Sequence, residues 1–160
     1  MILGNSLHML IVKKKLFERL AFPVSVNLFG QNKTFRGFIV LPVLGGMLAL
    51  LGSFLWGPFI ESHVNDMYIG FGLGFSFMLG ELPNSFVKRK LGIKNGEYSE
   101  KYRTVQMFFD RADSLIGIFI FYYLVTDIRF IDVIILFSLA MIFSFTTSVI
   151  LVKLKIKKGV

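Results

Sequence analysis

Four side chains able to handle phosphate chemistry recur within nine residues of this sequence. Glu81, Ser85, Lys88 and Arg89 are spaced three or four residues apart, so on a continuous helix they share one face. They follow a long run, from Met67 to Gly80, that carries no charge. Charges this close to an apolar run are costly in a membrane and are usually functional there.

Two aspartates close the same polar stretch. Asp110 and Asp113 are three residues apart and stand immediately before another apolar segment. A pair of carboxylates on one helical face suits a hard cation such as Mg²⁺, which prefers oxygen ligands and usually bridges to substrate phosphates. Bases beside these acids can hold phosphate charge.

A purely structural interpretation is also open. In it the acids only pair with bases near them in sequence: Glu81 with Lys88 or Arg89, and Asp110 or Asp113 with Arg111. The stretch would then be an ion-paired loop beside a membrane. The cost of holding several acids near hydrocarbon favours the functional interpretation.

Lys33 and Arg36 stand at the edge of the first long apolar segment. They either anchor that segment, with their charged ends reaching toward water, or act as phosphate ligands. Lysine would supply a point charge and arginine a bidentate fork. Composition alone favours anchoring.

The elements that position these residues are apolar helices. The chain of 160 residues is 54% hydrophobic, with 19 Phe and a mean hydropathy of +0.68, which indicates a membrane protein. Only the first and last of four apolar segments reach the roughly 20 residues that span a bilayer. The middle two are short unless they extend into the charged stretch. The four segments are Phe38–Ile60, Met67–Leu82, Ser114–Thr126 and Ile131–Val152.

The basic residues orient these four segments. All of the 18 Lys and Arg residues except Arg129 lie before the first segment, between the second and third, or after the last. The positive-inside rule places that side in the cytoplasm. This topology explains the net charge of +8 better than nucleic-acid binding does. We expect an integral cell-membrane protein whose site faces the cytoplasm.

The sequence therefore predicts an all-α fold: a polytopic membrane helical bundle with four long or medium spans and a cytoplasmic catalytic loop at about 83–112. Residues 1–160 form a single domain. The first twelve residues are apolar but too short to span, so we expect a shortened or interfacial N-terminal helix. Its Asn5 and His8 either face a cavity or lie at a polar boundary. The chain lacks cysteine, and its two histidines are far apart, so a zinc site is not expected.

Three sequence blocks, in this order, resemble the CDP-archaeol synthase family, membrane enzymes related to phosphatidate cytidylyltransferases. The resemblance covers about Gly30 to Gly117, with similar membrane segments. Glu81 stands where the family usually has Asp. The blocks are Asn32-Lys33-Thr34-Phe35-Arg36-Gly37-Phe38, then Gly80-Glu81 through Ser85-Phe86-Val87-Lys88-Arg89-Lys90-Leu91-Gly92-Ile93 to Gly96, and finally Asp110-Arg111-Ala112-Asp113.

The resemblance implies Mg²⁺-dependent transfer of CMP from CTP to a membrane lipid phosphate, which gives a CDP-activated lipid and pyrophosphate. It also implies roles for the residues singled out above, and it raises Lys33 and Arg36 to phosphate ligands. Asp110, Asp113 and Lys88 are then catalytic; Glu81, Asp110 and Asp113 hold the metal; Lys33, Arg36, Ser85 and Arg89 bind substrate.

Other functions remain open in the sequence. A CDP-alcohol phosphotransferase would carry a D-G-x-x-A-R motif, which is absent. A transporter-like protein would place polar residues at mid-span, whereas the acids here lie at one edge. A non-catalytic scaffold is a further alternative. The sequence does not name the lipid, and its glycine-rich helices leave room for a homodimer.

Overall fold

The computed structural model describes residues 1–97 and 102–153. This part of the chain is helical, with no strand beyond one isolated bridge between Pro23 and Thr34, so the predicted all-α class is confirmed. Lys101, Lys155, Lys157 and Lys158, which the topology prediction counted, lie outside the described residues. The helices are α1 (Ile2–Lys13), the 3₁₀ helix η1 (Glu18–Leu20), α2 (Val26–Phe29), α3 (Phe35–Trp56), α4 (His63–Lys90), α5 (Arg103–Val125) and α6 (Phe130–Lys153).

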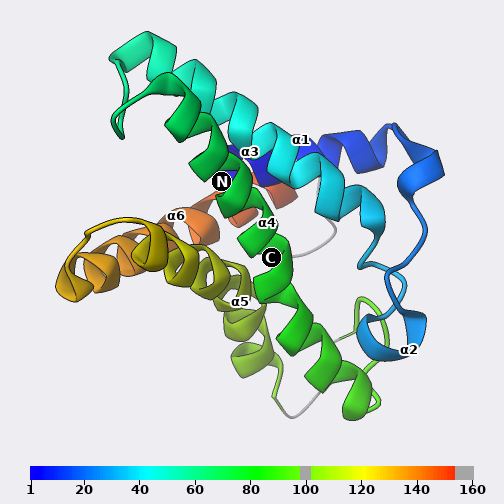
Figure 1. Cartoon of the computed structure of the whole chain (residues 1–160). Helices are drawn as coiled ribbons and strands as arrows, with labels where there is room; N and C mark the ends of the chain where they lie inside the picture. Colours follow the sequence, from blue (N-terminus) through cyan, green and yellow to red (C-terminus); the bar gives the residue numbers. More distant parts are fainter. Residues whose placement is uncertain (98–101, 154–160) are drawn as a thin grey trace.

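Helices α3 and α4 form a closely packed hairpin (Figure 1). Their backbones touch where Gly45 faces Gly70, because a Cβ built on Gly45 would lie 2.3 Å from the Gly70 carbonyl oxygen. In lipid, helix association depends on this kind of close packing between small residues. The turn of the hairpin is held by Asp66, whose carboxylate accepts hydrogen bonds from the N–H groups of Phe59 and Ile60, both at 2.9 Å.

Helix α5 makes a second close backbone contact with α4, nearer the charged end of α4. A Cβ built on Gly80 would lie 2.4 Å from the carbonyl oxygen of Asp113 and 3.0 Å from Cα of Gly117. Only glycine permits this approach. It brings the acidic end of α5 beside the charged last turns of α4.

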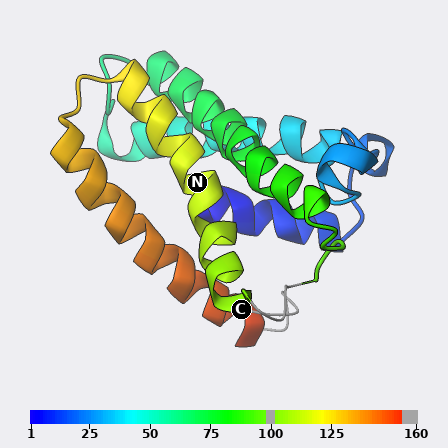
Figure 2. The same ribbon diagram turned by 90° about the horizontal axis from the view of Figure 1, so that it is seen from below.

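Helices α1 and α6 flank this core. Helix α1 lies along α3, with Gly4 beside Leu48 and His8 beside Gly37. Helix α6 packs against α5, where the ring centroids of Phe119 and Phe137 are 5.8 Å apart. Figure 2 shows α6 at the edge of the bundle.

Among the described residues, two helices are long and apolar enough to cross a membrane: Phe35–Trp56 and Phe130–Ile150. Only 6% of the second is buried within the protein, and large apolar side chains such as Leu124, which is 75% exposed, face outward. Outward-facing apolar surface is what a lipid environment requires.

The two middle apolar segments do extend into the charged stretch. Helix α4 continues through Pro83 to Lys90, and α5 begins at Arg103. Within the predicted cytoplasmic loop over 83–112, the chain is therefore helical up to Lys90 and again from Arg103. Pro83 removes one backbone donor and its ring crowds the carbonyl group four residues earlier, and side-chain contacts between α4 and α5 hold the last turns of α4 in place.

Candidate active site

Seven of the eight predicted site residues meet in one polar cavity of about 360 Å³. Helices α4 and α5 form its walls, together with the segment that leads into α3 and the connection after α4. In the segment after α4, Asn95 lies against Gly30. The backbone φ of Gly30 is +84°, a value that favours glycine. The predicted residues that line the cavity are Lys33, Glu81, Ser85, Lys88, Arg89, Asp110 and Asp113.

Arg36 is the exception, because it does not line this cavity. Its side chain is buried at the start of α3, where Nη1 donates a hydrogen bond to the Leu16 carbonyl oxygen at 3.2 Å. Its Nε–H is buried without a partner in the described part of the chain. The observed contact of Arg36 joins α3 to the segment after α1.

The ion pairs of the cavity join residues that are far apart in the sequence. Lys33 pairs with Glu81, and Lys88 pairs with Asp110. The local pairs of the structural interpretation are not among the ion pairs of the described residues. Helices α4 and α5 pack side by side, so the partner of Lys88 on α4 is Asp110 on α5.

Asn84 holds the two aspartates together. Its side-chain amide donates to Asp110 Oδ1 at 2.7 Å and to Asp113 Oδ2 at 2.8 Å. The backbone N–H of Ser114 donates to the other Asp113 oxygen at 2.5 Å. Sequence analysis missed Asn84, although its position three residues after Glu81 places it on the same helical face.

The surroundings of Asp113 raise the pKa of its carboxyl group. Asp113 precedes the apolar segment that begins at Ser114. Burial of its carboxyl group, reinforced by the nearby charge of Glu81, raises its pKa to about 6. The Asn84 hydrogen bond opposes this effect. A buried carboxylate next to another acid favours a positive ligand.

The donor chemistry fits Mg²⁺ at two of the three predicted ligands. Asp110 and Asp113 present oxygens on one face, held together by one amide, and Mg²⁺ is often bound by one or two carboxylates plus substrate phosphates. The predicted three-acid cluster is not formed: no three His, Asp or Glu side chains of the described residues lie close enough to share a metal. Glu81 is paired with Lys33, as Asp110 is with Lys88.

In the described part of the chain, an all-helical fold with two helices able to cross a membrane, and a cavity that combines paired aspartates with lysine and arginine, define a class: a helical membrane protein with a cavity lined by acids and bases. The chain belongs to the CarS-like family, described as CDP-archaeol synthase, whose profile matches residues 21–160. The family predicted from the sequence is thus confirmed.

Curated relatives agree with this assignment. The CDP-archaeol synthase of Pyrococcus furiosus is 28% identical over 131 residues, which cover 82% of this chain and 74% of the relative. That of Thermococcus kodakarensis is 31% identical over 70 residues, 44% of this chain and 41% of the relative. That of Thermofilum pendens is 42% identical over 81 residues, 49% of this chain and 35% of the relative. The last two matches thus span less than half of the relative's length. No solved structure matches the chain.

Proposed function

We propose that this chain transfers CMP from CTP to a lipid phosphate in the membrane, giving a CDP-activated lipid and pyrophosphate. Family membership supports the reaction class. The observation that carries the proposal is the arrangement of Asp110 and Asp113, joined by Asn84, beside Lys88 in a cavity of about 360 Å³. This cavity offers places for both a cation and a polyphosphate.

In this proposal the bases of the cavity bind the triphosphate. Lys88 and Lys33 are held as partners of Asp110 and Glu81, and Arg89 lines the same cavity. Arginine binds phosphate through a planar fork, whereas lysine acts as a point charge. Ser85 is 9% exposed, and its hydroxyl is a further donor for a phosphate oxygen.

Asp110 and Asp113 would hold Mg²⁺, which when bound neutralises triphosphate charge and polarises the phosphate under attack. The charge of Glu81 lies near Asp113 and adds to the negative potential of the cavity.

The reaction needs no protein base. An anionic oxygen of the lipid phosphate attacks the α-phosphorus of CTP, and a new P–O bond forms. The bond from the α-phosphorus to the oxygen that bridges to the β-phosphate breaks, and pyrophosphate leaves with that electron pair. Because the attacking oxygen is already deprotonated, catalysis consists of positioning and charge neutralisation.

We further propose four spans, one within each of the helices α3 to α6, with the cavity at the cytoplasmic surface. The distribution of basic residues supports this orientation. A cytoplasmic cavity gives a water-soluble nucleotide access to a site whose second substrate remains in the bilayer.

Incorporation of radiolabelled CTP into lipid, with purified protein and a dialkylglycerol phosphate, tests the proposal. Wild type should form labelled CDP-lipid, and Asp113→Asn should abolish it without loss of the folded, membrane-inserted protein. Asp132→Asn is the matched control, because Asp132 pairs with the exposed Arg129 at the start of α6. Wild type that incorporates no label would favour the non-catalytic scaffold.

A further inference from the structure

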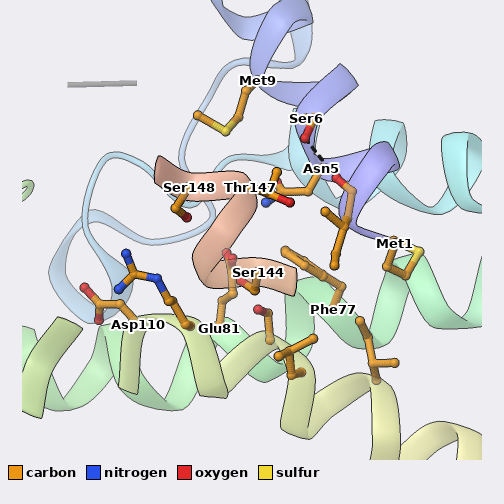
Figure 3. Close-up of a pocket in the computed structure, with 15 residues that line it drawn as sticks. Met1, Asn5, Ser6, Met9, Phe77, Glu81, Asp110, Ser144, Thr147 and Ser148 are labelled. Atoms are coloured by element: carbon orange, nitrogen blue, oxygen red, sulfur yellow. Dashed lines mark hydrogen bonds between the residues drawn. The ribbon is translucent and has the colours of Figure 1, made fainter. Parts of the chain in front are cut away.

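A second, smaller cavity adjoins the first. Its volume is about 160 Å³, and Glu81 and Asp110 line both cavities. Figure 3 shows these two acids on one side of it and side chains of α1 and α6 on the other. Asn5, one of the two polar residues noted in the N-terminal segment, lines this cavity. The two cavities therefore meet at the acids of the candidate active site.

Arg111 brings an unsatisfied cation to the smaller cavity, which it lines. Its Nη1 donates to the Met107 carbonyl oxygen at 2.9 Å, and its guanidinium lies 5.0 Å from the Phe145 ring centroid. Its Nε and Nη2 are buried and have no partner among residues 1–97 and 102–153. Buried charged donors without acceptors are costly, and the acids nearest in the cavity, Glu81 and Asp110, are already paired with lysines.

Helix α6 adds hydroxyl groups to the lining of this cavity. Ser138 and Thr146 donate back to helix carbonyl oxygens, both at 2.9 Å, as hydroxyls on apolar helices often do. Ser144, Thr147 and Ser148 instead line the cavity, and within the described ranges their hydroxyls form no such bond. Their spacing of three and four residues places them on one face of α6, where they can donate to a ligand.

The rest of the lining is apolar. Phe77, Leu115 and Ile118 belong to the buried core between α4 and α5 and also line this cavity. One compartment thus combines a cation and hydroxyl donors with hydrocarbon, and it lies between helices that are largely exposed on their outer faces. A ligand that fits this pattern is an anion attached to an apolar chain.

We propose that this compartment is the binding site of the lipid phosphate acceptor. Arg111 and the hydroxyls of Ser144, Thr147 and Ser148 hold the phosphate headgroup, while Phe77, Leu115 and Ile118 contact the start of its chains. The boundary at Glu81 and Asp110 then places the acceptor phosphate next to the nucleotide cavity. This inference rests on the function proposed above, but its test separates the two.

The test measures the Michaelis constants for each substrate with the full chain in detergent micelles. Arg111→Gln, and a triple variant Ser144→Ala, Thr147→Val and Ser148→Ala, should raise KM for a dialkylglycerol phosphate by about tenfold or more, because charge-assisted hydrogen bonds are lost. KM for CTP should stay unchanged. Thr146→Val and Ser138→Ala, whose hydroxyls bond to their own helix, are the matched controls and should change neither constant.

Other results would contradict the proposed lipid phosphate binding site. Weaker inhibition by pyrophosphate, with the lipid KM unchanged, would assign the compartment to the leaving group. Arg111→Lys keeps the charge without the fork and should fall between wild type and Arg111→Gln. If all three proteins have the same lipid KM, the role of Arg111 is structural.

Direct binding separates this inference from the proposed function. Native mass spectrometry without CTP should show a dialkylglycerol phosphate bound to wild type, weakened in Arg111→Gln, and no comparable binding of the dialkylglycerol that lacks phosphate. Lipid binding that depends on Arg111, without any CMP transfer, would refute the proposed CMP transfer and support the proposed lipid phosphate binding site. CMP transfer together with unchanged lipid binding in Arg111→Gln would support the proposed function and refute the proposed lipid phosphate binding site.

Discussion

Gly80 of α4 and Gly117 of α5 meet backbone to backbone. A Cβ built on Gly117 would lie 2.9 Å from the Cα of Gly80, and one on Gly80 would lie 3.0 Å from the Cα of Gly117. This contact sets the separation of the two helices one turn away from Asn84 and Asp113. The geometry of the candidate active site therefore depends on two residues that carry no chemistry themselves.

Gly80→Ala should separate these helices. Its Cβ would lie 2.4 Å from the backbone oxygen of Asp113, and backbone cannot yield as a flexible side chain can. Because a displacement of about 1 Å can lower a reaction rate about a hundredfold, we expect the rate of CMP transfer to fall about a hundredfold. Gly4→Ala is the control, since its Cβ would meet only side chains, at 3.6 Å or more. Equal activity of both variants would contradict the packing argument.

The ion pair of Lys33 and Glu81 should contribute to folding stability. Both side chains are only about one-fifth exposed, at 19% and 21%, so breaking the pair leaves a poorly hydrated charge. In a double-mutant cycle with Lys33→Met and Glu81→Gln, we expect a coupling energy of about 1–3 kcal/mol in the free energy of unfolding.

The pair of Arg129 and Asp132 provides the comparison for that cycle. Arg129 is 80% exposed, and exposed pairs are typically worth less than about 1 kcal/mol. A smaller coupling for Lys33 and Glu81 than for this exposed pair would show that the buried pair does not stabilise the fold.

Asn84→Ala should lower activity without removing any proposed ligand. The substitution deletes the amide that joins Asp110 to Asp113, so the two carboxylates are free to separate. We expect kcat to fall about ten- to hundredfold. Asn65→Ala is matched to it, because Asn65 bonds to the exposed Glu61 at the opposite end of α4. Equal kcat values for the two variants would argue against a positioning role for Asn84.

The activation of CMP transfer by Mg²⁺ should depend on pH. The pKa of Asp113 is raised to about 6, and a protonated carboxyl group does not bind the metal. Apparent Mg²⁺ affinity should therefore weaken as pH falls below about 6 and level off above it. Glu81→Gln removes one cause of the raised pKa and should move the midpoint to lower pH. An unchanged midpoint would assign the dependence to the nucleotide.

Single cysteines test the proposed orientation. The chain contains no cysteine, so Leu91→Cys, after α4, and Asp127→Cys, before α6, each add a unique thiol at an exposed position. In intact cells a membrane-impermeant maleimide should label only Asp127→Cys, and Leu91→Cys should react only after permeabilisation. The opposite pattern would invert the topology.

Much of the local architecture could be predicted from the sequence. Runs of apolar residues predicted the four long helices, since a helix in lipid must satisfy its own backbone groups. Spacings of three and four residues placed Glu81, Ser85 and Lys88 on one face of α4. The order of the three sequence blocks predicted the family. Each of these inferences uses only residues that are neighbours in the chain.

Contacts between helices were decided by the tertiary structure. The pairing of Lys33 with Glu81 and of Lys88 with Asp110, and the bridging by Asn84, depend on where α4 crosses α5 and on how the chain returns to α3. Local spacing predicted other partners because it carries no information on helix crossing. The smaller cavity likewise exists only where α1 and α6 approach the acids. Helical periodicity thus determines which side chains share a face, and three-dimensional packing determines what each face meets.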